Sequence, residues 1–296
     1  MKKDIIIAID IGGTTFESAV LDRDYTNIID ISNKWHVRDY NTSESLLEGI
    51  CKQIKDLLSS NSLEESRIRG LSVACPGPLD SKNGVILDTP NLTLFRNYKL
   101  KDKLRENFDC KVVVENDANL FALGEWSLSS QEEDVFLGVT VGTGLGFGII
   151  FNGKIFTGAN GMAAEYGISS CEWGTWEDKI SLHYVRSQIE KTYGEKISPR
   201  KIEEYAVNGD SKAQNIYNEF GKNLGIALSH TINMVDPGCI VLGGGLSNAF
   251  NVYSESLKDT LKEFSPIYKI NPCKIRESKF KSKSQMVGAA LNLKRR

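Results

Sequence analysis

The chain has 296 residues, of which 41% are hydrophobic and 25% charged, and its formal net charge is -2. These values are ordinary for a globular protein, and the length predicts two domains or lobes. Lysines and arginines (36) nearly balance the acidic residues (38), and no long basic segment occurs. The composition therefore argues against nucleic acid as a partner.

The sequence gives no indication of secretion or of membrane insertion. The apolar run near the N-terminus is short, is interrupted by Asp4 and Asp10, and precedes no small-residue cleavage site. No stretch approaches the roughly 20 apolar residues of a membrane span. The six cysteines are scattered without a C-x-x-C pair. This pattern predicts reduced thiols and a cytoplasmic location.

The first half of the chain predicts alternating strands and helices. Leucines and isoleucines recur at helical spacing between residues 42 and 60, with Thr42 or Ser43 as the helix cap. The next strand stops at Pro76-Gly77-Pro78, which neither a helix nor a central strand could carry. In order, we expect strand–turn–strand over 5–22, a helix over 42–60, a strand over 68–75, a helix over 98–108, a strand over 111–117 and a helical run directly after Asp117.

The second half of the chain repeats the opening pattern of strand, glycine-rich turn and strand. It predicts three strands over 135–156, an amphipathic helix over about 213–234, a strand at CIVLGGGLS, a helix near 248–263 and a last helix from about Ser284. Two halves that begin alike, without a fixed solenoid period, indicate an internal duplication.

Two glycine-rich turns interrupt the predicted strands, DIGGTT at residues 10–15 and GTGLGFG at residues 142–148. The first lacks the lysine of a P-loop, and the second leads into a strand rather than a helix, so both standard phosphate-binding loops are excluded. Either turn alone fits an ordinary hairpin. Two of them, the first preceded by Asp10, favour phosphate binding, because glycine lets backbone N–H groups approach phosphate oxygens closely.

Seven motifs follow one another along the chain: DIGGTT, ACPGPLD, TPNL, ENDANLFALGE, VTVGTGLGFGII, GANGMAAEYG and IVLGGGLS. In this order and spacing the chain resembles the ROK family of sugar kinases and repressors from about residue 5 to 292. The resemblance implies an α/β, actin-like (ribonuclease H-like) duplicated ATPase fold, with ATP and sugar in a cleft between two lobes. We expect an N-terminal lobe over 1–117, a larger C-terminal lobe over 118–283, and a last helix near 284–296 that packs back on the first lobe.

The resemblance also implies which residues hold Mg-ATP. Asp10 matches the carboxylate near Mg²⁺, which it would contact through water because Mg²⁺ keeps much of its hydration. The alternative is a strand-end aspartate that only caps the turn. The expected nucleotide-binding residues are Gly12, Gly13, Thr14, Thr15, Gly142, Thr143, Gly144, Gly243, Gly244 and Gly245. For Gly243, Gly244 and Gly245, tight packing between a strand and a helix explains the glycines equally well.

Asp117 is the expected catalytic base. It lies at the junction of a strand and a helix inside the best-matched motif, and the family's matching aspartate takes the proton of the sugar hydroxyl. The alternative is a helix N-cap, for which asparagine and aspartate are preferred. Both roles are compatible, since a capping aspartate is fixed in orientation.

Further residues are expected to bind the sugar by hydrogen bonding. Asn91 could instead be a turn residue after Pro90. Glu177 matches the glutamate that ends the family's zinc motif, although the shortened loop leaves Asp178 as an alternative. The expected sugar-binding residues are Asn91, Asn116, Asp117, Glu165 and Glu177.

The chain departs from the family at the structural zinc site. The family continues E-x-G-H and C-x-C-G-x-x-G-C-x-E, whereas this chain reads EYGISSCEWGTWEDKIS, with Ile168 at the histidine position and Cys171 as the only thiol. One thiol cannot complete a four-ligand zinc site, so we predict no zinc. Our hypothesis is that Ile168, Trp173 and Trp176 order this loop by apolar packing instead.

From the resemblance we expect an ATP- and Mg²⁺-dependent kinase that phosphorylates a sugar primary hydroxyl, O6. Bacterial members without the zinc site resemble N-acetylmannosamine kinases, which makes that sugar the first expectation and glucose or allose the second. The family's repressors carry an N-terminal helix-turn-helix, for which the residues before Gly12 leave no room. A sugar-binding protein without catalysis is the other rival, which the intact Asp10 and Asp117 argue against. A homodimer is expected by family precedent.

Overall fold

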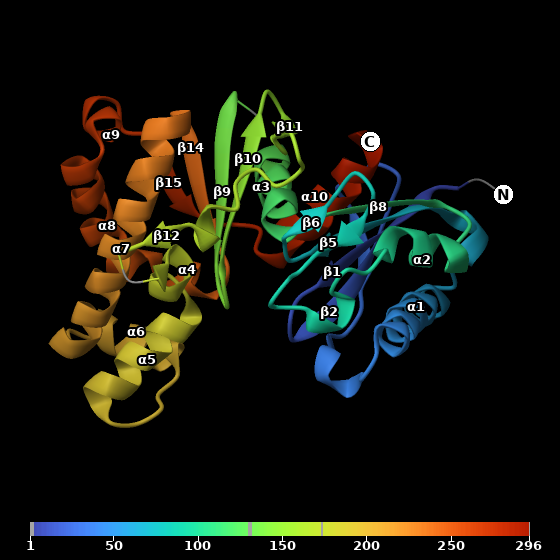
Figure 1. The fold of residues 1–296 in the computed structure, drawn as a ribbon, viewed down its shortest axis with the longest axis horizontal. Coiled ribbons are helices and arrows are strands. Elements are labelled where there is room, and N and C mark those ends of the chain that lie inside the picture. The colour runs from blue at the N-terminus through green and yellow to red at the C-terminus, as the bar shows by residue number, and fades with distance from the viewer. Residues whose placement is uncertain (1–2, 130–131, 173, 296) are drawn as a thin grey trace. The chain divides into compact units, whose positions relative to one another are not determined.

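The fold is described from a computed structural model of the chain, which describes residues 3–129, 132–172 and 174–295 (Figure 1). The chain forms two compact units. Unit 1 comprises Met1–Gln131, Gly153–Ala164 and Phe280–Arg296, and unit 2 comprises Glu132–Asn152 and Glu165–Lys279. Unit 1 thus extends past residue 117, because the helix that begins there packs on the C-terminal helix and against the sheet of the same unit.

Unit 1 contains a mixed sheet with the strand order β3-β2-β1-β5-β8, and β4 also pairs with β2. β1 is antiparallel to β2 and parallel to β5, which is parallel to β8. The strands are β1 (Ile5–Ile11), β2 (Thr15–Leu21), β3 (Ile28–Ile31), β4 (Trp35–His36), β5 (Ile68–Cys75) and β8 (Lys111–Asn116), with the short β6 (Leu79–Asp80), β7 (Val85–Ile86) and β11 (Lys154–Ile155) outside this order. The helices are α1 (Ser43–Ser60), α2 (Leu100–Asn107), α3 (Asp117–Leu128) and α10 (Ser282–Arg295).

The apolar run of β1 is continuous because helices cover both faces of the sheet (Figure 1). Side chains alternate along a strand, so the odd-numbered isoleucines, such as Ile7, belong to the core with α1 and α2. The even-numbered residues Ile6 and Ala8 belong to the core with α3 and α10. By the same alternation Asp10 lies on the α10 face, where its side chain meets that helix.

Unit 2 repeats this pairing pattern. The sheet strands that belong to unit 2 have the order β10-β9-β14-β15, with β9 antiparallel to β10 and parallel to β14, and β14 parallel to β15. The same sequence of pairings joins β2, β1, β5 and β8, which supports the predicted duplication. The strands are β9 (Val135–Val141), β10 (Leu145–Phe151), β12 (Ser170–Cys171), β13 (Gly174–Thr175), β14 (Cys239–Gly243) and β15 (Lys274–Glu277). The helices are α4 (Trp176–Lys179), α5 (Leu182–Tyr193), α6 (Pro199–Val207), α7 (Ser211–Val235), α8 (Phe250–Phe264) and α9 (Pro266–Ile270).

The strand and helix predictions agree with the structure at most positions. Thr42 is the cap of α1, since its hydroxyl accepts a hydrogen bond from the Ser45 N–H at 3.1 Å. All six cysteines are free thiols. In the described residues, no helix is long and apolar enough to cross a membrane.

Glycines allow α10 to lie directly against α3. A Cβ built at Gly288 would overlap the backbone carbonyl of Leu120 and would lie 2.9 Å from the Gly124 nitrogen. Gly288→Ala is therefore expected to destabilise unit 1 by about 1–3 kcal/mol, because backbone atoms cannot yield as a flexible side chain does. Urea denaturation measures this loss. Gly245→Ala is the control, since no heavy atom lies within 4 Å of a Cβ there, and equal losses in both variants would contradict the packing argument.

Candidate functional site

Three parallel strands of unit 1 end together and bring two acidic residues to one edge of the sheet. In the register of β1, β5 and β8, Asp10 is opposite Ala74, and Cys75 is opposite Asn116. Asp117 follows at the start of α3. The carboxyl ends of parallel strands are where open α/β sheets bind their ligands, so this edge is the candidate site of unit 1.

The start of α3 separates the two roles considered for Asp117. Asn116 is the N-cap: its side-chain oxygen accepts hydrogen bonds from the Ala118 and Asn119 N–H groups, at 2.9 and 3.2 Å. Asp117 occupies the first helical position, and its Oδ1 accepts a hydrogen bond from the Ala118 N–H at 2.8 Å. The helix end is thus capped by Asn116, and the Asp117 carboxylate is held against the first turn.

Buried Glu115 stabilises the junction between β8 and α3. Its Oε1 accepts hydrogen bonds from the Asn116 N–H at 2.9 Å and from the Asn119 side-chain amide at 3.1 Å. Because these bonds tie the end of β8 to the first turn of α3, they fix the orientation of Asn116 and Asp117. Preorganisation of this kind is what a catalytic carboxylate requires.

The acidic neighbours of Asp10 outweigh its positively charged neighbour, Lys34. Burial, followed by repulsion from Asp117 and Glu17, raises the pKa of Asp10 from 3.8 to about 7, against the opposing effects of Lys34 and of a hydrogen bond from Gln285. That bond runs from Gln285 Nε2, on α10, to Asp10 Oδ1 at 2.6 Å. Carboxylates gathered with too little counter-charge suit a hard divalent cation that keeps its waters, so Asp10 fits the role expected for it beside Mg²⁺.

The Asp10 carboxyl is expected to make the stability of the ligand-free protein depend on pH. Its folded pKa lies above the unfolded value, so the folded state holds a proton that the unfolded chain has already released. Between about pH 4 and about pH 7 this contribution to the unfolding free energy falls as pH rises, by at most about 4 kcal/mol. Gln285→Ala should raise this pKa further, because it removes a hydrogen bond to the charged form.

Urea unfolding across this pH range, with carboxyl NMR of Asp10, measures the effect. Asp10→Asn should remove the Asp10 contribution. The matched control Asp22→Asn, just after β2, should keep it. An Asp10 carboxyl that titrates near 4 in the folded protein would contradict the assigned environment.

The Gly12–Thr15 turn contacts the loop that carries Asn91. The Gly12 N–H donates to the Thr15 carbonyl at 2.9 Å and closes the turn. Gly13 and Thr14 are exposed, as is Asn91. A Cβ at Gly13 would overlap the backbone carbonyl of Asn91, so glycine is required for this contact. The predicted phosphate-binding turn and one predicted sugar-binding residue therefore lie side by side in unit 1.

In unit 2, the Gly142–Gly144 turn contacts a predicted sugar-binding residue in a similar way. Glu177 Oε2 accepts a hydrogen bond from the Leu145 N–H at 2.9 Å, and a Cβ at Gly144 would overlap this carboxylate. Asp178 instead completes the capping box of α4, whose N-cap is Thr175: its Oδ2 accepts hydrogen bonds from the Thr175 N–H and hydroxyl, both at 2.8 Å. Of the two alternatives, Glu177 is the one whose carboxylate reaches the turn.

The remaining predicted residues also belong to unit 2. Glu165 occupies the position before the 3₁₀ turn Tyr166–Ile168, and its side chain makes no capping hydrogen bond there. Gly243 ends β14, and Gly244 has φ +82° and approaches the Val141 backbone too closely for a side chain. At Gly245 the space is open. The glycine triplet thus serves tight packing at Gly244 and leaves room for a ligand at Gly245.

The loop that replaces the zinc motif agrees with our hypothesis at Trp176 and differs from it at Ile168. Ile168 is 55% exposed, so its predicted packing role is wrong, and Trp173 lies outside the described residues. Trp176 is buried, stacks on Tyr166 with ring centroids 6.4 Å apart and meets the His230 ring edge-on. The Tyr166 hydroxyl and His230 Nδ1 are 2.6 Å apart. Within the ranges described, no three His, Cys, Asp or Glu side chains are grouped to hold a metal.

Gln285 and Glu115 are residues of the candidate site that sequence reasoning missed. Glu115 lies within the ENDAN motif, at the end of an apolar strand, and Asn119 follows four residues later. A glutamate in such a strand needs a hydrogen-bond partner, and the Asn119 side-chain amide supplies it. Gln285 is 275 residues from Asp10 in the chain, and no local pattern marks it.

Comparisons with known proteins agree with this geometry. The profile of the ROK family matches residues 6–296. An N-acetyl-D-glucosamine kinase of Mannheimia succiniciproducens is 30% identical, over 87% of this chain and 89% of its own length. Among solved structures, a ROK glucokinase of Streptomyces griseus bound to glucose and AMPPNP is 26% identical, over 99% of this chain and 100% of that one, with a TM-score of 0.83. A proposed N-acetylmannosamine kinase of Listeria monocytogenes is 25% identical, over 98% and 99%, with a TM-score of 0.82.

The fold class follows from these likenesses. The solved sugar kinases have the actin-like ATPase fold, and this chain superimposes on them over nearly its whole length. The predicted duplicated α/β ATPase fold is therefore confirmed.

Proposed function

The chain belongs to the ROK family, and we propose that it is a kinase that transfers the γ-phosphoryl group of ATP to O6 of N-acetyl-D-mannosamine. The products are the sugar 6-phosphate and ADP. One observation supports the kinase assignment most strongly. Asp10 and Asp117, the residues expected at the metal and at the sugar hydroxyl, lie close enough that the charge of one raises the pKa of the other.

In the proposed mechanism Asp117 accepts the proton of the sugar hydroxyl as that oxygen attacks the γ-phosphorus and ADP departs. Phosphoryl transfer of this type depends on positioning and on charge neutralisation more than on covalent chemistry. Asn116 and the Glu115 hydrogen bonds hold Asp117 in place. Magnesium, which Asp10 would hold through water, neutralises the charge of the transferring phosphoryl group when bound.

The two Gly-Thr turns are the proposed phosphate-binding elements. In unit 1, Gly13 and Thr14 are exposed and Thr15 is half-buried, and their backbone N–H groups and threonine hydroxyls are the proposed phosphate donors. In unit 2, no heavy atom lies within 4 Å of a Cβ built at Gly142, so a phosphate can approach that backbone. Asn91, Asn116, Glu165 and Glu177 are the proposed sugar ligands.

The choice of an acetamido sugar rests on the departure from the zinc motif. Ile168 replaces a histidine that would donate a hydrogen bond, and its exposed side chain is available to contact an acetamido methyl group. The relatives include kinases of both classes of sugar, since one acts on N-acetyl-D-glucosamine and another was solved with glucose. Glucose and allose are the alternatives.

A coupled ADP-release assay over a panel of sugars tests the proposal. The panel holds N-acetylmannosamine, N-acetylglucosamine, glucose and allose, each with Mg-ATP. The highest kcat/KM is expected for N-acetylmannosamine. Preference for glucose would overturn the substrate but keep the kinase, whereas sugar binding without ADP release would favour a regulatory protein.

A further inference from the structure

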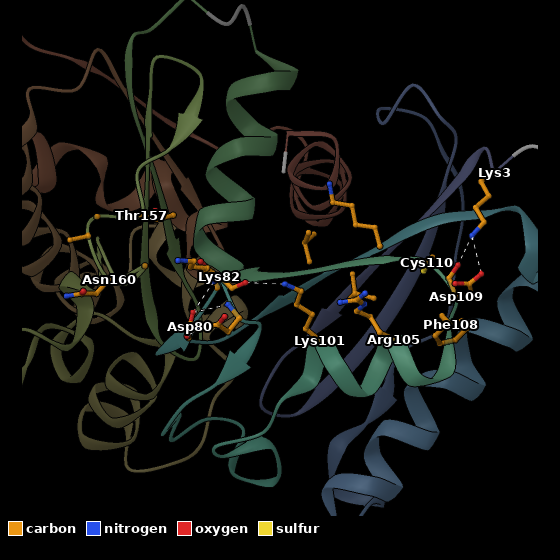
Figure 2. Close-up of a pocket in the computed structure, with 18 residues that line it drawn as sticks. Lys3, Asp80, Lys82, Lys101, Arg105, Phe108, Asp109, Cys110, Thr157 and Asn160 are labelled. Atoms are coloured by element: carbon orange, nitrogen blue, oxygen red, sulfur yellow. Dashed lines mark hydrogen bonds and ion pairs between the residues drawn. The ribbon is translucent and has the colours of Figure 1, made fainter.

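Unit 1 contains a cavity that none of the proposed kinase residues lines. Its volume is about 1080 Å³ (Figure 2). Its lining comes from the turn at residues 80–83, helix α2, the segment at residues 108–110, the first residues of β8, and the loop at residues 157–161, together with Lys3 near the N-terminus. β8 is the last strand in the order of its sheet, and the cavity lies at its start, whereas Asp117 follows its end. Six residues of strand span about 20 Å, so this cavity is separate from the catalytic edge.

Positive charge dominates the lining of the cavity. Five cationic and two acidic side chains line it, in a chain whose net charge is -2. The cations are Lys3, Lys82, Lys101, Arg105 and Lys111, and the acids are Asp80 and Asp109. Lys101 and Arg105 are four residues apart on α2 and therefore lie on one face of that helix.

The acidic residues of the lining do not neutralise most of these cations. Asp80 is engaged by its own turn, where it accepts hydrogen bonds from the Lys82 and Asn83 N–H groups and the Asn83 amide. Asp109 pairs with Lys3, since its Oδ2 lies 3.8 Å from Lys3 Nζ. Lys101 Nζ donates to the Lys82 carbonyl at 3.1 Å, which orients its charge without pairing it. In the part of the chain that the structure describes, no carboxylate lies within 4.0 Å of the charged groups of Lys82, Lys101, Arg105 or Lys111.

Backbone groups complete the other side of the cavity. Gly158 and Gly161 have φ of +67° and +79°, and the Ala163 N–H donates to the Thr157 carbonyl at 3.1 Å, so residues 157–163 form a tight loop. A Cβ at Gly161 would be 3.5 Å from Ser81 Oγ, which places this loop against the turn at 80–83. In Figure 2, Asn160 and Thr157 lie at one end of a row that continues through Lys82 and Lys101 to Arg105. Tight glycine loops present N–H groups that bind anions.

From this arrangement we propose that the cavity binds a small molecule that carries two or more phosphate charges. The arginine fork and the lysine ammonium groups are the side chains that bind phosphate best. The volume exceeds what phosphate alone would fill and leaves room for an organic part. The proposal does not depend on the kinase reaction, because it uses none of the residues assigned to it.

Amide NMR of the full chain tests the proposal with three probes: pyrophosphate, glucose 6-phosphate and ADP. At least one probe should shift the amides of Val112, Val113 and Gly158, and the best probe shows whether phosphate, sugar or nucleotide is recognised. The double variant Arg105→Gln/Lys111→Gln should weaken that binding about tenfold or more, because it removes two charge-assisted contacts. Arg105→Lys should weaken it less, since it keeps the charge.

Lys52→Gln, an exposed charge change on α1 in the same unit, is the matched control and should leave the affinity within about twofold. All variants remove surface side chains, and thermal melts that match the parent protein verify their folding. Shifts confined to the amides of Gly12–Thr15, equal affinity in the double variant, or no shift with any probe would each overturn the proposal.

Discussion

Asp117→Asn is expected to lower kcat by about 10²- to 10⁴-fold, the range that a general base contributes. Asparagine has nearly the same shape but cannot accept the sugar proton. Asn116 carries the helix cap, and asparagine can still accept from the Ala118 N–H, so the start of α3 should stay intact. Steady-state kinetics and calorimetric titration of the sugar measure the two quantities separately, and the sugar affinity should change by less than about tenfold.

Asp102→Asn is the matched control for this prediction. Asp102 also lies in the first turn of a helix of unit 1, but it is exposed and lies outside the catalytic motif, on a different helix. Its kcat should equal that of the parent protein. If Asp117→Asn kept a kcat within about threefold of the parent, the assignment of the base would be wrong.

Gly13→Ala is expected to have the second largest effect and to lower kcat/KM for ATP and for the sugar together. The new Cβ would overlap the Asn91 backbone carbonyl, so the phosphate turn or the Asn91 loop must move. Displacement of about 1 Å in a positioning element costs about 10²-fold in catalysis. We therefore expect kcat/KM for both substrates to fall by about that factor.

The neighbouring Gly12 provides the control. A Cβ at Gly12 would lie 3.4 Å from the Thr15 carbonyl, an ordinary contact, so Gly12→Ala should be much milder. Measurement of kcat/KM for ATP and for the sugar in both variants compares two adjacent glycines with the same substitution. Equal losses would show that backbone freedom matters, rather than the contact with Asn91.

Strong local patterns predicted most of the fold. The strand predicted over 68–75, before the Pro-Gly-Pro sequence, is observed as β5. The helix predicted from the leucine and isoleucine spacing is observed as α1, and it ends at Ser60 as expected. β15 was missed because it is a four-residue edge strand whose side chains are all at least partly exposed, so it has no apolar signal. Short exposed strands depend on their neighbour for stability rather than on their own sequence.

The candidate site was predicted where its residues lie in motifs and missed where tertiary contacts decide. Asp10 lies just before the first glycine-rich turn, and Asp117 directly follows a strand, so the sequence could predict that both lie at strand ends. The hydrogen bond from Gln285 could not, because it joins the last helix to the first strand. Ile168 was expected to pack in that loop, but its side chain is exposed. Trp176 packs as expected, and its partners Tyr166 and His230 were not predicted.

Phosphorus–proton correlation NMR of the reaction product tests the central claim most directly. With Mg-ATP and the preferred sugar of the panel, the parent protein should yield one phosphomonoester whose phosphorus couples to the C6 protons, in equal amount to ADP. Asp117→Asn should form it at the reduced rate given above. A phosphate on another sugar oxygen, or ADP released only with inorganic phosphate, would contradict the account.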